Sequence, residues 1–376
     1  MTKDYNNLVR LQNLLHSFVN NAIPFVCYRL PQSSSIIVSV FNQHKIKEIN
    51  NSEDIRNEGF VFYPFDANKE TPGLFIEPSF SFSNENIPTD FSFDFSKSEP
   101  QNLNFPNRVI QSEKIVRQNY FIGITEILKK IDNASIDKVV LSRTKYISDC
   151  SINRAPDILI ELIKSYDNAF AYLLFIPGKM AWMGASPEIL IESDGENFRT
   201  ISLAGTVLCE KHEEKIWNKK ELHEQKLVSS FIEDTLIKNN VRELKQKGPF
   251  TVRAGNLFHL RSDFTFKSYA QKFSKIAFDL HPTPAVCGLP QDLAKEIILK
   301  VEKHNRQYYS GFLGPVKNGK SNLYVNLRCM QFLNNGLVLY AGGGIVKGSE
   351  PEKEWAETEN KTKTLLSIIE KISKFA

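Results

Sequence analysis

Apolar residues along the chain recur at two spacings, and these spacings mark the elements that we expect. Steps of three or four residues predict amphipathic helices, whereas short runs rich in β-branched and aromatic residues predict strands. The predicted helices cover residues 4–20, 108–131, 155–165, 218–237, 291–301 and 350–374. The predicted strands cover residues 25–30, 35–41, 59–63, 73–76, 136–143, 169–175, 180–184, 188–192, 200–206, 321–332 and 336–341. Because helices and mostly antiparallel-looking strands mix without a repeat or a linker, we expect one large α+β domain with stacked, mostly antiparallel sheets flanked by helices.

One poorly patterned stretch separates two parts of the chain. Residues 82–107 are rich in Ser, Asn, Asp and Pro and show little periodicity, which predicts an exposed loop. The residues before this stretch contain no group of side chains suited to catalysis. We therefore expect residues 1–107 to be a variable N-terminal part that completes the sheets, and residues 108–376 to hold the functional side chains.

The three glycines at 342–344 predict a place where the backbone approaches a ligand. We expect a strand to end at these glycines, whose N–H groups no side chain would cover. Ser349 and Glu352 have the spacing of a capping box for the helix that follows. On that helix Glu357 and Lys361 continue an apolar stripe, and charges on an inward face are costly unless they are paired. Two interpretations stay open here, a partly exposed ion pair and a buried functional site.

Two other charged residues also lie among apolar neighbours. Lys138 has Ile136 and Val140 on the same face of its predicted strand, although most such lysines reach water from a strand end. Glu224 belongs to the apolar stripe of the helix at 218–237, which makes it a candidate metal ligand. The preceding histidine resembles the start of a zinc-protease motif, but residue 227 is leucine, so that motif is absent.

Composition excludes several classes of protein. The 376 residues carry a net charge of +4, with basic and acidic residues interspersed, so nucleic acid is not an expected partner while an anionic substrate is compatible. The five cysteines form no C-x-x-C pair, which argues against a disulfide framework and a zinc knuckle. No signal peptide and no membrane-spanning run is visible, so we expect a soluble, cytoplasmic protein with no membrane partner. We expect a monomer.

Nine short segments in the second part of the chain form an ordered series. They are Lys138-Val-Val-Leu-Ser-Arg143, Gly184-Ala-Ser-Pro-Glu188, Leu203-Ala-Gly-Thr206, Glu221-x-x-Glu-x-x-Leu-Val228, His281-Pro-Thr-Pro-Ala285, Arg306-Gln-Tyr-Tyr-Ser-Gly311, Leu327-Arg328, Ala341-Gly-Gly-Gly-Ile345 and Glu354-Trp-x-Glu-Thr-x-x-Lys361. Through these segments, residues 110–374 resemble the chorismate-utilising enzymes, and most closely the isochorismate synthases of menaquinone or siderophore pathways. The resemblance implies that residues 108–376 form a chorismate-binding catalytic part.

The resemblance also implies a reaction and the residues that catalyse it. Isochorismate forms when water adds at C2 of chorismate while the C4 hydroxyl leaves, which requires a base and an acid on opposite sides of the ring. The implied base is Lys138, and the implied acid is Glu188. These roles need a lysine whose pKa is lowered and a glutamic acid whose pKa is raised by desolvation.

A divalent cation and several substrate contacts follow from the same resemblance. Glu224 and Glu357 match Mg²⁺ ligands of the family, and Glu354 and Glu221 lie one helical turn away. Arg328 matches the arginine that binds the enolpyruvyl carboxylate. The implied substrate-binding residues are Ala204, Gly205, Thr206, His259, Ala285, Val286, Tyr309, Arg328, Gly342, Gly343 and Lys361.

Alternatives inside and outside the family remain to be weighed. Relatives that aminate chorismate lack a lysine at position 138 and differ around residues 281–290, and this chain contains no fused glutaminase, so no glutaminase subunit is expected. Salicylate synthases share the lysine and the acid and go on to eliminate pyruvate, which makes them the second choice. A catalytically inactive module that binds an anionic metabolite would be expected to lack one of the catalytic residues, and all of them are present.

Overall fold

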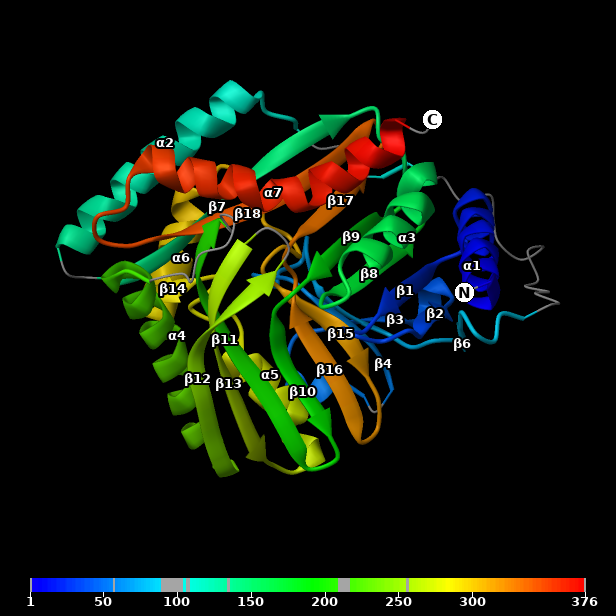
Figure 1. Ribbon diagram of the computed structural model, residues 1–376, viewed down its shortest axis with the longest axis horizontal. Helices are drawn as coiled ribbons and strands as arrows, with labels where there is room; N and C mark the ends of the chain where they lie inside the picture. Colours follow the sequence, from blue (N-terminus) through cyan, green and yellow to red (C-terminus); the bar gives the residue numbers. More distant parts are fainter. Residues whose placement is uncertain are drawn as a thin grey trace.

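Two large antiparallel sheets lie face to face in the protein, with helices on both outer faces (Figure 1). This architecture was obtained as a computed structural model, which describes residues 2–56, 58–88, 104–105, 109–133, 136–208, 217–254 and 257–374. Every strand pairing in the described residues is antiparallel, so the expected α+β domain with stacked antiparallel sheets is confirmed.

Nine strands form each sheet in this part of the chain. The first sheet, sheet A, contains in spatial order β14 (Gly288–Leu289), β7 (Lys138–Ser148), β18 (Gly336–Ile345), β17 (Cys329–Leu333), β9 (Met180–Ser186), β8 (Phe170–Ile176), β1 (Phe25–Arg29), β2 (Ile36–Val40) and β6 (Phe80–Ser83). The second, sheet B, contains β12 (Arg242–Ala254), β13 (Leu257–Lys267), β11 (Asn197–Leu208), β10 (Ile189–Asp194), β16 (Lys320–Val325), β15 (Phe312–Val316), β4 (Gly59–Tyr63), β5 (Gly73–Ile76) and β3 (Ile46–Ile49). The strands of residues 1–107 occur in both sheets.

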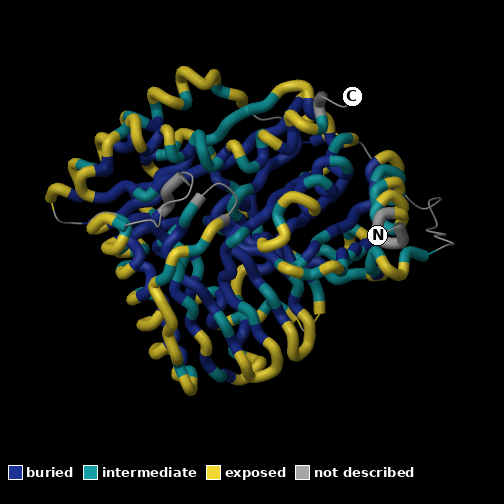
Figure 2. Tube along the Cα trace, in the orientation of Figure 1, coloured by how far each residue is buried: buried dark blue, intermediate teal, exposed yellow. Residues whose placement is uncertain are grey.

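Helices cover the outer faces of the sheets because each presents an apolar stripe to them. Three helices share an apolar core with sheet A, namely α1 (Thr2–Asn20), α3 (Ala155–Ser165) and the second half of α7 (Pro351–Lys374). Sheet B is covered by α4 (Lys219–Lys238) and α5 (Phe273–Leu280). The start of β7 packs against α2 (Glu113–Asp132) and α6 (Gln291–Val301). The resulting layers are buried at the centre and exposed along the outer helix faces (Figure 2).

A dense aromatic core joins the inner faces of the two sheets. Phe62 from sheet B stacks on Tyr308 with ring centroids 4.1 Å apart and meets Trp182 from sheet A edge-on at 6.1 Å. Phe170 and Tyr324 stack across the sheets at 4.4 Å. Such rings bury large apolar areas and pack best in offset or edge-on geometry. The functional cavity described below lies at one end of this core.

The expected strand at 321–332 is wrong, because the chain changes sheet inside it. Residues up to Val325 belong to β16 in sheet B, and the chain re-enters sheet A at Cys329. Between them Arg328 has a φ of +48°, a left-handed conformation that interrupts strand geometry. Apolar residues occur on both sides of Arg328, a pattern compatible with one strand or with two, so periodicity alone did not reveal the break.

The glycine strand and the helix after it also differ from expectation. Strand β18 does not end at the glycines but runs through them to Ile345, with Gly342 opposite Ser142 of β7. Ser349 lies two residues before the first residue of α7, and its hydroxyl accepts a hydrogen bond from the N–H of Val346 at 3.2 Å. The helix begins at Pro351, a residue suited to the first helical position because it needs no N–H partner there.

Other expectations concern the loop at 82–107, the cysteines and membrane-spanning segments, and some of these residues lie outside the described chain. Most of the loop expected at 82–107 lies outside the described residues. The described Phe82 and Phe105 are buried, and Phe82 belongs to β6. Cys27, Cys150, Cys287 and Cys329 are buried and unbridged, and Cys209 lies outside the described residues. Among the helices of the described part, none is long and apolar enough to cross a membrane.

Candidate active site

A cavity of about 110 Å³ lies where β7 and β18 of sheet A meet β11 of sheet B, between α4 and α7. It contains most of the residues that the sequence analysis singled out. The predicted residues on its wall are Lys138, Glu188, Ala204, Gly205, Glu221, Glu224, His259, Ala285, Val286, Tyr309, Arg328, Gly342, Glu357 and Lys361. A larger cavity of about 610 Å³ runs along the other edge of β7, and none of these fourteen residues lines it.

Three predicted residues do not contribute a described side chain to this wall. Thr206 belongs to β11, and its side chain lies outside the described residues. Gly343 faces the opposite side of β18, where a side chain would meet the carboxylate of Glu354 and the hydroxyl of Tyr120, both at 3.3 Å. Glu354 is therefore separated from the cavity by the glycine strand, unlike Glu357 on the next turn of α7.

Lys138 is the first residue of β7, and its side chain pairs with a carboxylate from α4, a helix that covers sheet B. Its Nζ lies 3.5 Å from Oε2 of Glu224, and both side chains are buried. Gly344 on the neighbouring strand makes room for this pair, because a Cβ there would lie 2.9 Å from Cε of Lys138 and 3.3 Å from the Glu224 carboxylate. The absence of a side chain at 344 thus sets the position of the lysine.

Replacing Gly344 with alanine should displace the lysine without unfolding the protein. The closest contact of the new Cβ is the far end of a flexible side chain, so the strand can remain in place while the ammonium shifts. A displacement of about 1 Å can lower a rate by roughly 10²-fold. Steady-state kinetics and thermal unfolding of Gly344→Ala would test this, with Gly343→Ala, on the opposite face of β18, as the matched control. Wild-type turnover in Gly344→Ala would contradict it.

Glu188 lies on the connection from β9 to β10, where the chain passes from sheet A to sheet B. Its N–H donates to the Ser186 hydroxyl at 3.3 Å, and its carbonyl accepts from the N–H of Val325 at 3.0 Å. Burial raises the pKa of its carboxyl to about 8, although Lys138 and Lys361 act in the opposite direction. Glu188 is therefore mainly protonated at neutral pH and can donate a proton into the cavity.

The first half of α7 presents a second lysine and a second carboxylate to the cavity. Nζ of Lys361 lies 2.6 Å from Oε1 of Glu357 and donates to the carbonyl of Gly342 at 2.9 Å. In an antiparallel strand the N–H and C=O of one residue point to the same edge. The N–H of Gly342 therefore points away from β7, on the side of α7, where it could serve an anion as predicted.

Arg328 occupies the left-handed position between β16 and β17. One of its Nη1–H groups donates to the carbonyl of Lys361 at 3.0 Å, which links the arginine to α7. Burial lowers the pKa of its guanidinium from the ordinary value, but an arginine remains a cation throughout the physiological range. A guanidinium has five N–H donors in a planar fork, so this anchor leaves donors for a carboxylate.

The expected Gly-Thr turn after residue 200 is a bulge within β11. The register against β13 shifts between Ala204 and Thr206, and Gly205 has a φ of +59°, which only glycine adopts readily. The N–H of Ala204 already donates to Oε1 of Gln225 at 3.1 Å. Ala204 therefore forms part of the wall, but its N–H is not available to a substrate.

Two further titratable residues of the wall, His259 and Tyr309, are neutral at pH 7. Burial lowers the pKa of His259 to about 3, with Arg328 and Lys361 adding to the effect. Burial raises the pKa of Tyr309 to about 12, and its ring stacks on Tyr340 at 5.5 Å. Both side chains can thus exchange hydrogen bonds with a ligand without adding charge.

Two buried residues that support the wall were missed by the sequence analysis. Arg306 donates to the carbonyls of Val140 and Val286, at 2.5 and 2.9 Å, and forms a buried ion pair with Glu302 at 2.6 Å. Gln225 fixes the bulge of β11. A signal was present for the first, because Glu302 and Arg306 are four residues apart, a spacing typical of an ion pair.

Comparison with known proteins identifies the family of the chain. The family model described as chorismate binding enzyme matches residues 83–370. The isochorismate synthase EntC of Escherichia coli (strain K12) is 30% identical over 322 residues, which cover 81% of this chain and 79% of EntC. Two crystal structures share the fold. DhbC of Bacillus anthracis has a TM-score of 0.77 at 24% identity, covering 96% of this chain and 99% of its own.

The second structure is MenF, the menaquinone-specific isochorismate synthase of Escherichia coli. Its TM-score is 0.74 at 23% identity, and the match covers 92% of this chain and 88% of MenF. At these identities the two structures establish the fold, whereas the family match and the EntC match establish relationship. The chain therefore belongs to the chorismate binding enzyme family and groups within it with the isochorismate synthases.

Proposed function

We propose that the protein is a Mg²⁺-dependent isochorismate synthase in which Lys138 is the general base and Glu188 the general acid. The observation that carries this proposal is that a lysine and a protonated glutamic acid share one cavity with Arg328. Lys138 is the first residue of β7, whereas Glu188 lies on the connection from β9 to β10, so the two groups come from separate segments of the cavity wall. This arrangement supports water as the nucleophile, because water must be deprotonated while the departing hydroxyl must be protonated.

The proton transfers balance in the proposed reaction. Lys138 removes a proton from water as its oxygen bonds to C2 of chorismate and the ring double bonds shift. The bond between C4 and its hydroxyl oxygen breaks, and Glu188 protonates that oxygen so that it leaves as water. The product is an isomer of the substrate. The relative EntC is an isochorismate synthase by name, which agrees with this reaction.

The charge of the cavity is suited to a dianion only when a cation is added. Besides neutral Glu188, the wall carries the basic side chains Lys138, Arg328 and Lys361 and the carboxylates Glu221, Glu224 and Glu357. Lys138 acts as a base in its uncharged amine form, which leaves three carboxylates facing two cations. A divalent cation would add two positive charges, which equals the charge of the two substrate carboxylates.

Glu224 and Glu357 are the residues that would hold this cation. Within the described residues no group of three or more His, Cys, Asp and Glu side chains could bind a metal without help. Two carboxylates are nevertheless suited to Mg²⁺, which usually takes one or two protein carboxylates and completes its coordination with water and substrate oxygen. When bound, Mg²⁺ would supply positive charge beside the substrate's ring carboxylate. Glu354, behind the glycine strand, is not a direct ligand in this proposal.

The test is incubation of the purified protein with chorismate and Mg²⁺. Chromatography should detect isochorismate, and EDTA should abolish its formation. Glu357→Ala should lose the Mg²⁺-dependent activity, while Glu370→Ala, at the far end of the same helix, should retain it. A rise of salicylate fluorescence without an added lyase would favour the salicylate synthase alternative. Product formation that persists in EDTA would remove the metal from the proposal.

A further inference from the structure

The orientation of α7 about its own axis decides what it presents to the cavity. Successive residues of an α-helix are separated by about 100° around the axis. Rotation of the whole helix by that angle would therefore move each side chain away from its present contacts. Glu357 and Lys361 are one turn apart and both line the cavity. The contacts that fix the rotation of α7 therefore control the proposed metal ligand and the lysine together.

Arg143 of β7 makes the most extensive of the described contacts with this part of α7. The residue lies five positions after Lys138, and its side chain is 2% exposed. Its Nε donates to the Thr358 hydroxyl at 2.6 Å, and its Nη2 forms an ion pair with Glu359. The guanidinium carbon lies 3.9 Å from the centre of the Trp355 ring, a close cation–π contact.

These three contacts define one face of the helix. Trp355, Thr358 and Glu359 are spaced i, i+3 and i+4, so they lie side by side on the surface of α7. The Thr358 hydroxyl also donates to the carbonyl of Trp355 at 2.7 Å, which fixes the acceptor for Arg143. The planar guanidinium of Arg143 contacts this face at several points and therefore resists rotation of the helix. A contact at a single point would permit that rotation.

We propose that Arg143 is a positioning residue that orients α7, so that Glu357 can bind the metal and Lys361 can reach the substrate. This inference rests on the proposed function of the cavity and assigns a role to a residue outside its wall. Groups that orient metal ligands from behind commonly change metal affinity or activity by about 10- to 100-fold when they are removed.

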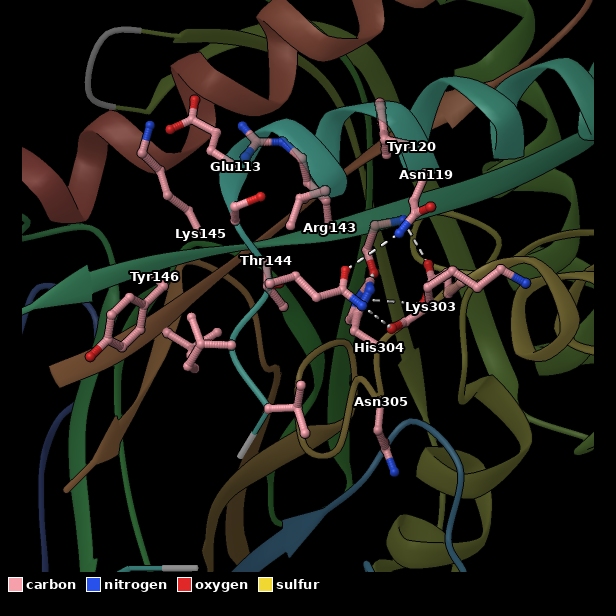
Figure 3. A pocket seen from close by; sticks show the side chains of 18 of the residues that line it. Glu113, Asn119, Tyr120, Arg143, Thr144, Lys145, Tyr146, Lys303, His304 and Asn305 are labelled. Atoms are coloured by element: carbon pink, nitrogen blue, oxygen red, sulfur yellow. Dashed lines mark hydrogen bonds and ion pairs between the residues drawn. The ribbon is translucent and has the colours of Figure 1, made fainter. Parts of the chain in front are cut away.

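Lys145 provides a matched control on the same strand. Its Nζ lies 2.8 Å from the other oxygen of Glu359, but its side chain is 20% exposed. Figure 3 shows Arg143 and Lys145 leaving β7 beside the cavity of about 610 Å³ that both residues border. Because this cavity adjoins Arg143, a small cation could enter it and take the place of a truncated arginine.

The experiment compares Arg143→Lys, Arg143→Ala and Lys145→Met with the wild type. Mg²⁺ affinity is measured by isothermal titration calorimetry, which does not require turnover, and chorismate KM and kcat are measured separately. We expect Mg²⁺ affinity to fall by about 10- to 100-fold in both Arg143 variants and by less than about 3-fold in Lys145→Met. Methylguanidinium at millimolar concentration should restore part of the affinity of Arg143→Ala, whereas methylammonium should not.

Unchanged Mg²⁺ affinity in folded Arg143→Lys would overturn the inference, because a purely structural role would lower the unfolding temperature alone. Should the Arg143 variants fail to fold, Thr358→Val removes the acceptor of Nε, together with the donor to the Trp355 carbonyl, and should weaken Mg²⁺ binding in the same direction; wild-type affinity in that variant would count against the inference. The two proposals can fail separately. A wild type that binds Mg²⁺ but forms no isochorismate contradicts the proposed reaction, whereas an active wild type with unaltered Arg143 variants contradicts only the positioning role.

Discussion

Replacing Lys138 with methionine should lower kcat for isochorismate formation by about 10²- to 10⁴-fold, the usual contribution of a general base. Methionine fills a similar volume but cannot accept a proton from water. The change also leaves the buried carboxylate of Glu224 without its partner at 3.5 Å, so we expect the unfolding temperature to fall as well. Kinetics at saturating Mg²⁺ and thermal unfolding separate these two effects.

The control for this substitution is Lys275→Met. Lys275 pairs with Asp279 on the surface of α5, and its side chain is 60% exposed. Exposed pairs of this kind contribute little to stability, so turnover and unfolding temperature should both stay near the wild-type values. Lys138→Met with normal turnover would exclude this lysine from the reaction.

Replacing Glu188 with glutamine should lower kcat by a similar factor of about 10²–10⁴, because an amide of the same shape cannot protonate the leaving hydroxyl. In the wild type the same carboxyl should make activity fall as the pH rises through about 8, since it must be protonated to act. The pH profile should therefore show a decrease in activity on its alkaline side. A rate that stays constant from pH 7 to pH 10 would contradict the role of Glu188 as acid.

The raised pKa of Glu188 also makes the stability of the fold decrease as the pH rises. Because it is raised from 4.5 to about 8 in the folded protein, the protonated carboxyl stabilises the fold fully below pH 4.5. That contribution declines as the pH rises and is lost by about pH 8. Glu188→Gln should remove this pH dependence and unfold at a higher temperature than the wild type at pH 8 to 9. Such an inactive but more stable variant is typical of a strained catalytic group.

The sequence predicted the cavity residues better than it predicted the backbone that holds them. Lys138, Glu224 and Glu357 were recognisable because a charge among apolar neighbours conflicts with a purely structural role. Gln225 was not, because only the tertiary fold brings its partners on β11 and β13 close, and for Arg306 the only signal was its spacing from Glu302. Whether each cavity residue has its proposed role stays a prediction for the experiments above.

The features that the sequence analysis missed have more than one physical cause. Strand β12 forms the edge of sheet B and is mostly exposed, so it has no buried face to produce an alternating pattern. The change of sheet at Arg328 and the bulge at Gly205 depend on single backbone conformations. Hydrophobic periodicity averages over several residues and cannot report one residue with positive φ.

Two of the crossings between the sheets, the connections from β9 to β10 and from β16 to β17, have a consequence for inactivation. Glu188 and Arg328 are the residues at which the chain leaves one sheet and enters the other, whereas Lys138 belongs to sheet A alone. The distances between Lys138, Glu188 and Arg328 thus depend on how the two sheets pack against each other through the aromatic rings between them. A small displacement of one sheet relative to the other, under heat or mild denaturant, should abolish the activity while the circular dichroism spectrum is still native.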